Sequence, residues 1–421
     1  MPSADTGAPP RPPCCRVRLP PGPALALVML LGVILQAAMG LCLPITGDEV
    51  NAVGIGAEWA RTGRVIASLP GQDVTSHSPM GAFIHVVFGF TQRIAEGVGS
   101  GRILTFALMV AAALLLAASL WRHVSPSFAV WFTAAYWLGP WTVYHAAMAW
   151  EPALTMALAA VVFSACLHLR ERAGQAASAA VVWALAAALQ VHGQFVVLVT
   201  AVGWLAATRR IRVAVAGSVA GLVVGSVTLW PSLFPRPIQA MENAVSKEHE
   251  DARIGFGLMQ GYPMLRAAGF WFRMSSADLN RQFRENRLYR VEPSDSMAAK
   301  ATKRTLSVGL LGLSLASVLT SVVACVWFYR RSTAAGLDAS MAWLRSYSMV
   351  LCGSLFVATA ASPVCIQGYH AMAAATGAAI PFAAWCGWLW SSDRRWARPL
   401  IVALFAVRVA VTLFVAVGRR L

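Results

Sequence analysis

Residues 24–50 read ALALVMLLGVILQAAMGLCLPITGDEV. The run 24–43 is almost wholly apolar, and as a helix its length of about 30 Å matches the hydrocarbon core of a bilayer. Pro44 ends the run, and Asp48 and Glu49 follow shortly after it. The pattern predicts a membrane anchor that brings two carboxylates to one membrane surface.

Similar apolar runs recur along all 421 residues, of which 58% are apolar and only 12% charged. A soluble domain has roughly a quarter of its residues charged, and a β-barrel needs alternating segments of about ten residues. We therefore expect an all-α polytopic membrane protein with about eleven transmembrane helices. The expected spans are 24–43, 102–121, 128–148, 152–169, 176–190, 194–207, 212–230, 304–328, 341–361, 371–390 and 398–417.

The net charge of +16 has a membrane explanation. Pairs such as Arg209-Arg210, Arg330-Arg331 and Arg394-Arg395 lie between apolar runs, as cytoplasmic loops do under the positive-inside rule. We therefore expect a multi-pass protein of the plasma (inner) membrane and no nucleic-acid partner. The long loops then face the periplasm or exterior.

The segment 79–94 decides the parity of this topology. If it crosses, the later arginine clusters fall outside, against the positive-inside preference. It is also short and carries His85 and Arg93. We predict an outer juxtamembrane helix with Ser78 as N-cap and Pro79 at its first position.

Four regions follow from this organisation. Residues 1–23 hold eight prolines and are expected to form a disordered cytoplasmic tail. Residues 24–230 form a transmembrane module with the outer loop 44–101. Residues 231–303 form a second outer loop, in which aromatic residues alternate with arginines as in interfacial helices. Residues 304–421 are C-terminal transmembrane helices.

None of the 18 acidic residues lies in the middle of an expected span, which disfavours ion-coupled transport. Thr46 and Glu49 form a capping-box pattern, which by itself explains Glu49 as a cap. Asp48 then lies in the first helical turn, where the macrodipole favours an ionised base. In the last span, an unpaired Arg408 would be costly, so we expect it to bond backbone carbonyls.

Two further residues have alternative explanations. Glu151 is either an N-cap before Pro152 or a second carboxylate that faces Asp48 and orients an acceptor. His192 is either a polar residue in an outward turn or a donor to a phosphate.

These motifs together resemble the polyprenyl-phosphate-dependent GT-C glycosyltransferases, in particular the protein O-mannosyltransferase and lipid A aminoarabinose transferase branch. The resemblance covers roughly residues 24–230. It is carried by Gly47-Asp48-Glu49, Ser76-His77-Ser78-Pro79-Met80-Gly81, Ser100-Gly101-Arg102, Trp150-Glu151-Pro152 and His192-Gly193.

The resemblance implies a GT-C-like fold and a chemistry. Asp48, with Glu49, would be catalytic: Asp48 would deprotonate an acceptor hydroxyl that attacks, with inversion, a sugar on polyprenyl phosphate. His77 matches the family position that meets the lipid phosphate. Arg102 and His192 would add donors to that phosphate. Glu151 would orient the acceptor, which is a glycan, a lipid or a protein.

The family's aminoarabinose transferases have an acidic residue that can bind metal where this chain has Ser76. The outer cavity also offers no compact set of three or four ligands at usual spacing. We therefore expect no cofactor and metal-independent transfer, with a divalent metal at Glu49 or Glu151 as the alternative. Two rival functions remain, a flippase or exporter of lipid-linked saccharides and a non-catalytic membrane scaffold.

Overall fold

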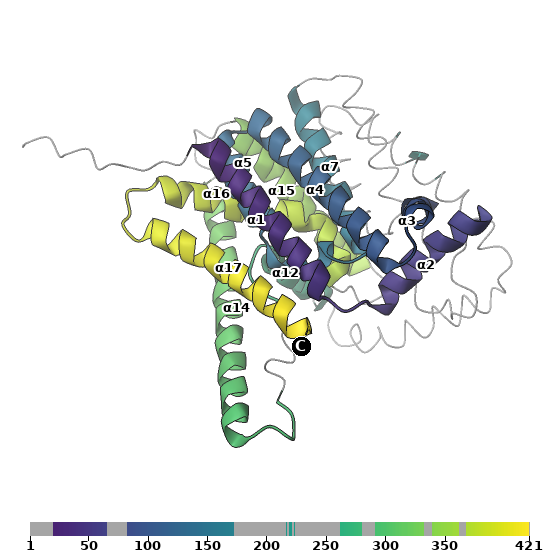
Figure 1. Ribbon diagram of the computed structural model, residues 1–421. Helices are drawn as coiled ribbons and strands as arrows, with labels where there is room; N and C mark the ends of the chain where they lie inside the picture. The colour runs from purple at the N-terminus through teal and green to yellow at the C-terminus, as the bar shows by residue number, and fades with distance from the viewer. Residues whose placement is uncertain are drawn as a thin grey trace, which may run out of the picture.

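The structure is a computed structural model, and it is built from helices with no strand among the residues that it describes. Figure 1 shows several long helices packed side by side, with α2 and α3 together at one end. The helices are α1 (Pro21–Cys42), α2 (Gly47–Thr62), α3 (Ala82–Ile94), α4 (Val98–His123), α5 (Pro126–Trp137), α6 (Pro140–Ala146), α7 (Glu151–Glu171), α12 (Tyr262–Met274), α14 (Met297–Arg331), α15 (Ala339–Ala361), η3 (Gly368–Ala374), α16 (Ala375–Ser391) and α17 (Ala397–Arg420). The described residues are 20–64, 82–171, 262–279, 291–331, 339–361 and 368–420, with single positions 216, 219, 220 and 223.

Helix α1 is the predicted first span. Pro21 begins it, at a position where a missing backbone N–H costs nothing. The helix has 22 residues and is about 33 Å long. It ends at Cys42, and the extended backbone of Leu43 leads into Pro44, so the predicted anchor is confirmed.

Six helices in the described part of the chain are long and apolar enough to cross a membrane. They account for six of the expected spans and make this a multi-pass membrane protein. These spans are Pro21–Cys42, Val98–His123, Met297–Arg331, Ala339–Thr359, Ala371–Ser391 and Ala397–Gly418.

The expected span 128–148 is not one continuous helix. The chain forms α5, ends that helix at Trp137, and starts α6 at Pro140. Proline cannot donate the N–H that a continuous helix needs, and Gly139 before it has extended backbone. With 12 residues, α5 is about 18 Å long, too short to cross alone.

Several expectations fall outside the described residues. They include the tail 1–19, the spans 176–190 and 194–207 and most of 212–230. The count of eleven spans therefore stays a prediction. Helix α7, which begins at Glu151, contains the expected span 152–169.

Helices α2 and α3 pack closely against each other because two glycines meet. A Cβ on Gly56 would lie 2.6 Å from the backbone nitrogen of Gly89, and one on Gly89 would lie 2.7 Å from the carbonyl oxygen of Gly56. Helix α3 has 13 residues, about 20 Å, which suits the predicted interfacial helix rather than a crossing. It begins at Ala82, and the predicted cap Ser78 lies outside the described residues.

The second long loop differs from its prediction in two ways. Helix α12 does not lie only on the surface: its Phe270, Trp271 and Met274 are buried, and it packs against α15 and α16. Helix α14 begins at Met297 rather than at residue 304, and its 35 residues give it a length of about 52 Å. The end of the loop is therefore a helix that projects from the bundle (Figure 1).

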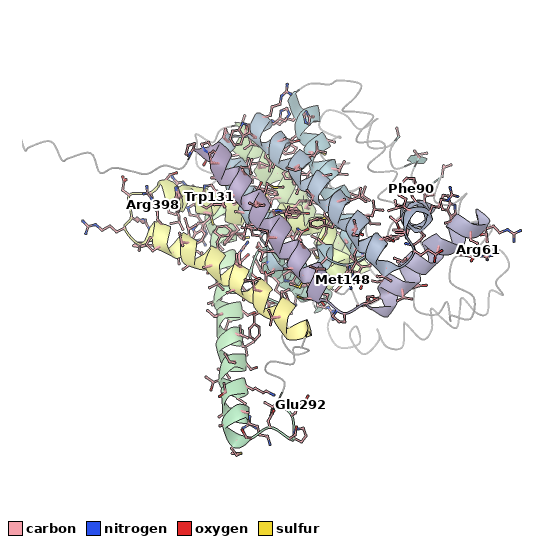
Figure 2. The ribbon with its side chains drawn as sticks, viewed as in Figure 1. Arg61, Phe90, Trp131, Met148, Glu292 and Arg398 are labelled. Atoms are coloured by element: carbon pink, nitrogen blue, oxygen red, sulfur yellow. The ribbon has the colours of Figure 1, made fainter. Side chains whose placement is uncertain are left out.

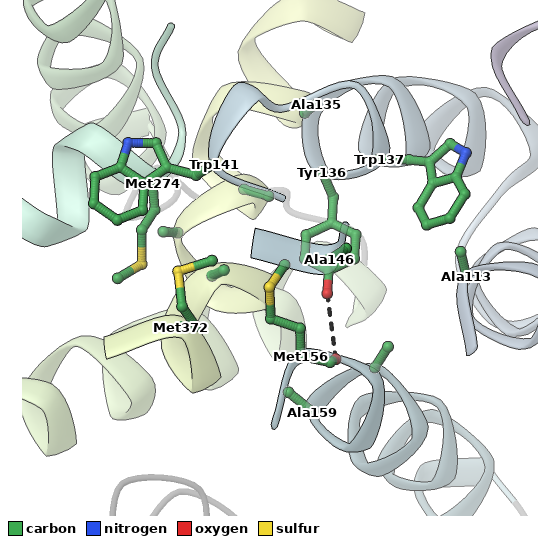
Figure 3. Packing of buried hydrophobic residues seen from close by; sticks show 14 of the residues in the cluster. Ala113, Ala135, Tyr136, Trp137, Trp141, Ala146, Met156, Ala159, Met274 and Met372 are labelled. Atoms are coloured by element: carbon green, nitrogen blue, oxygen red, sulfur yellow. Dashed lines mark hydrogen bonds between the residues drawn. The ribbon is translucent and has the colours of Figure 1, made fainter. Parts of the chain in front are cut away.

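Helices α5 and α1 pack closely against each other in the core. Trp137 is fully buried, and its indole N–H donates to the carbonyl oxygen of Met29 over 3.1 Å. Next to it, Tyr136 donates to the carbonyl oxygen of Met156 in α7 over 3.3 Å, as Figure 3 shows. Gly32 makes room for the indole, because a Cβ there would lie 2.0 Å from Trp137 Nε1.

We predict that Gly32→Ala destabilises the protein by about 1–3 kcal/mol, because the added methyl overlaps the Trp137 ring. Gly40→Ala on the same helix is the matched control, since its Cβ would meet only Ala147 O at 3.6 Å. Thermal unfolding in detergent measures both. Equal midpoints for the two variants would contradict this packing.

Candidate functional site

The candidate site begins with the cap of α2. The backbone N–H of Glu49 donates to Thr46 Oγ1 over 3.3 Å, and Thr46 N–H donates to Glu49 Oε2 over 3.1 Å. This is the predicted capping box, and it is confirmed. It fixes the start of α2 directly after α1 and puts Asp48 in the first turn.

A bidentate ion pair joins this cap to α4. Arg102 Nε donates to Glu49 Oε1 and Arg102 Nη2 donates to Glu49 Oε2, each over 2.7 Å. The carboxylate is fully buried, and the arginine side chain is 14% exposed. Such paired, parallel hydrogen bonds are among the strongest that proteins make.

The other N–H groups of Arg102 bind the end of α1. Nη1 donates to the carbonyl oxygens of Gly40 and Leu43 over 2.7 and 2.9 Å, and Nη2 donates to that of Pro44 over 3.0 Å. A guanidinium has five N–H donors, so Arg102 uses all of them here. This arrangement leaves no N–H for the lipid phosphate that the sequence assigned to Arg102.

Glu49 reaches a fourth segment, the turn between α6 and α7. The backbone N–H of Ala149 donates to Glu49 Oε1 over 2.9 Å. Burial raises the pKa of the Glu49 carboxyl, but the hydrogen bonds from Arg102, Ala149 and Thr46 lower it by more, so the pKa lies below its ordinary value. Glu49 is therefore an ionised, fully engaged group, which suits positioning better than proton transfer.

Asp48 differs from its neighbour in exposure. It precedes Glu49 in the first turn of α2, and its side chain is exposed. The N-terminal end of a helix stabilises a nearby negative charge, so the position suits a carboxylate that must stay ionised. The ion pair of Glu49 and Arg102 fixes the backbone next to Asp48, so this exposed carboxylate lies where α1, α2 and α4 meet.

The same ion pair also brings the start of α7 to the junction of α1, α2 and α4. Ala149 is held by Glu49, and Glu151 begins α7 two residues later. Met148, labelled in Figure 2, marks this turn beside the junction of α1 and α2. The structure therefore brings together four predicted site residues: Asp48, Glu49 and Arg102, and the backbone of Glu151.

The side chains of three predicted site residues are not described. His77 and His192 lie outside the described residues, and of Glu151 only the backbone is described. Their roles stay predictions. No group of three or more His, Cys, Asp or Glu residues suited to a metal occurs in the described part of the chain, so the expectation about metal also stays a prediction.

Two features of this region were not predicted. Asn51 is 7% exposed, and its Oδ1 accepts no hydrogen bond within the described part of the chain. It lies three residues after Asp48, so helical spacing could have marked it as a neighbour. His145 packs between the rings of Trp141 and Trp150, at centroid distances of 5.3 and 5.6 Å.

Arg408 has the structural role that its sequence position predicted. It is 2% exposed and donates through Nη1 to the carbonyl oxygen of Ala135 over 2.8 Å and through Nη2 to that of Ser275. Its guanidinium also lies 4.1 Å from the centre of the Phe382 ring. The expected bonds to backbone carbonyls are confirmed.

The helices and this site define a class: a multi-pass helical membrane protein with an exposed carboxylate held at one end of its bundle. No protein-family model matches the sequence, and no curated protein sequence matches it. Solved structures do. The chain is similar to ArnT from Cupriavidus metallidurans bound to undecaprenyl phosphate, with a TM-score of 0.50 and 11% identity over 94% of this chain and 75% of that chain.

ArnT from the same organism in the apo state has 13% identity and a TM-score of 0.43, over 94% of this chain and 78% of that chain. The likeness to the lipid-bound structure shows the fold. This chain has a GT-C-like fold, as the sequence predicted, while the branch within that fold stays a prediction.

The Glu49 pair generates a pH prediction. Because the native pKa of Glu49 lies below its ordinary value, its contribution to stability is complete above that ordinary value and is lost as the pH falls through the native pKa. We expect unfolding midpoints to fall below about pH 4, and Glu49→Gln to flatten this fall. Thermal unfolding in detergent between neutral and acidic pH measures it.

Glu58→Gln is the control, because Glu58 lies on the same helix in an exposed ion pair with Arg61. This variant should keep the acid dependence of the unchanged protein. If Glu49→Gln keeps it too, the buried pair is not what couples stability to pH.

Proposed function

We propose that this protein is a membrane glycosyltransferase that moves a sugar from a polyprenyl-phosphate donor to a hydroxyl group of a glycan, lipid or protein acceptor. The observation that carries the proposal is the exposed Asp48 held by the buried Glu49–Arg102 pair at one end of a GT-C-like bundle. A similar fold is found in a protein bound to undecaprenyl phosphate, which supports a donor of that chemical class.

Asp48 acts as the base in this reaction. It accepts the proton of the acceptor hydroxyl, whose oxygen forms a bond to the anomeric carbon of the sugar. The bond from that carbon to the phosphate oxygen breaks, and polyprenyl phosphate leaves with the electron pair. Attack opposite the leaving group inverts the anomeric configuration.

The other residues divide into two groups. Glu49 and Arg102 are positioning residues, since their polar atoms bind each other and the backbone of α1 and of the turn before α7. Glu151 orients the acceptor from the start of α7. His77 and His192 donate to the phosphate, whose charge grows as the sugar leaves, through charge-assisted hydrogen bonds.

The lipid donor also sets the location of the site. A polyprenyl chain is too apolar to leave the bilayer, so the reacting groups must lie at head-group depth. The position of Asp48, shortly after the end of the spanning helix α1, supports such a depth. We place the site on the periplasmic or exterior face of the plasma (inner) membrane, opposite the arginine-rich loops.

We predict that Asp48→Asn lowers turnover about 10²- to 10⁴-fold, because the amide cannot accept the proton. The assay uses purified protein in liposomes of host envelope lipid with undecaprenyl-phosphate-linked glucose, mannose or aminoarabinose. Mass spectrometry follows release of undecaprenyl phosphate and labelling of the acceptor. Glu58→Gln, on the same helix, should turn over normally.

Unchanged turnover in Asp48→Asn, with normal unfolding temperature, would remove Asp48 as the base. Movement of the intact donor across the liposome bilayer without its cleavage would support a flippase or exporter instead. Asp48→Asn and Glu58→Gln variants with the same effect in every assay would support the membrane scaffold.

We also predict that transfer needs no metal, since donors from His77 and His192 meet the charge of the leaving monophosphate. Turnover should be unchanged after EDTA and after later addition of Mg²⁺, Mn²⁺ or Zn²⁺. Loss of turnover with EDTA, restored by one of these metals, would mean that a carboxylate of the site is a metal ligand.

A further inference from the structure

A second site lies at the other end of the bundle, on the last turns of α14. Six described residues, all on α14, line a shallow and open groove there, and they change in character along the helix. Val322, Val323 and Val326 come first, followed by Trp327 and then Arg330-Arg331. The groove is therefore apolar at one end and cationic at the other.

The cationic end is built by stacked rings from two helices. Trp327 of α14 and Trp388 of α16 stack with their centroids 4.9 Å apart. Arg331 lies over both rings, 5.6 and 5.2 Å from their centres. Arg394, in the turn before α17, also lies over Trp388, 5.6 Å from its centre. We call these four residues the Trp–Arg cluster.

The charge around this cluster is predominantly positive. Five arginines lie between positions 320 and 331 of α14 and between positions 385 and 400, whereas Asp393 is the only acidic residue in those two described stretches. Arg398 extends the same arrangement, 5.5 Å from the centre of the Trp390 ring, which in turn packs on Trp131. Figure 2 shows Arg398 and Trp131 at this end of the bundle. A ligand with complementary charge is an anion.

The depth of the groove identifies the kind of anion. From Val322 to Arg331 the helix rises about 14 Å, which takes the groove from the hydrocarbon region to head-group depth. Val323 and Val326 are 54% and 45% exposed, so the apolar end offers its side chains to an acyl chain. A molecule that matches both ends has an acyl chain joined to a phosphate.

We propose that this groove binds one anionic phospholipid, with an acyl chain along Val322, Val323 and Val326 and its phosphate between Arg331 and Arg394. The rings of Trp327 and Trp388 hold the two guanidinium groups in place for that phosphate. The proposal does not depend on the glycosyltransferase assignment, because the groove is at the end of the bundle opposite Asp48.

A general attraction of arginines to an anionic membrane would depend on the number of charges alone. Binding at a specific site instead depends on which arginines are present. The pair Arg331→Gln with Arg394→Gln removes two charges from the cluster. The matched control, Arg122→Gln with Arg395→Gln, removes two charges from the same end of the bundle, at exposed positions outside the cluster.

Native mass spectrometry of the full-length protein in mild detergent, with added phosphatidylglycerol or phosphatidylcholine of equal chain length, tests the site. We expect one phosphatidylglycerol to be retained in preference to phosphatidylcholine. The cluster variant should reduce the bound fraction at least fivefold, and the control should change it less than twofold. Equal losses in both variants, or no preference between the lipids, would overturn the proposal.

A second variant, Val323→Trp, fills the apolar end and keeps every charge. It should also lose the lipid, and undiminished retention would contradict the acyl-chain position. Glycerol phosphate, which has no acyl chain, is the competitor. Displacement of the lipid by millimolar glycerol phosphate would mean a site for a soluble phosphate and would overturn the assignment to a phospholipid.

Discussion

The buried ion pair of Glu49 and Arg102 is the interaction on which the candidate site depends. It joins four segments: the end of α1, the start of α2, the start of α4 and the turn before α7. Removing one partner of a buried pair typically costs about 3–5 kcal/mol, because the other charge is left without compensation. Asp48 is adjacent to this pair, so its location follows from the pair's geometry.

A second set of buried polar contacts, around residues 275–279, holds the bundle together. Residues 275–279, which follow α12, are buried without being helical. Non-helical backbone among membrane helices is stable only where protein groups satisfy it. Arg408 binds the carbonyl oxygen of Ser275, and Trp141 donates to that of Asp278, whose carboxylate accepts from Arg273 and Ser314. These contacts link the segment after α12 to Ser314 of α14 and Arg408 of α17.

Sequence could predict the features that depend on nearby residues or on burial alone. The length of α1, the Thr46 cap and the carbonyl bonds of Arg408 are of this kind. The partner of Glu49 is 53 positions away, and Ala149 is 100 positions away, and no helical period reports contacts at such separations. From sequence alone Arg102 is therefore expected at a phosphate, whereas in the structure its five N–H groups bind Glu49 and the backbone of α1 and Pro44. The break at Gly139-Pro140 lies inside an otherwise apolar run, whose length and composition alone indicate one continuous span.

A cryo-electron microscopy structure of the protein with undecaprenyl phosphate would show whether the Glu49–Arg102 pair positions Asp48 at the donor. We expect the pair to stay closed, with the phosphate near Asp48 but not bonded to Arg102. A guanidinium of Arg102 that leaves Glu49 and binds the phosphate would contradict this expectation, as would a phosphate bound far from the start of α2.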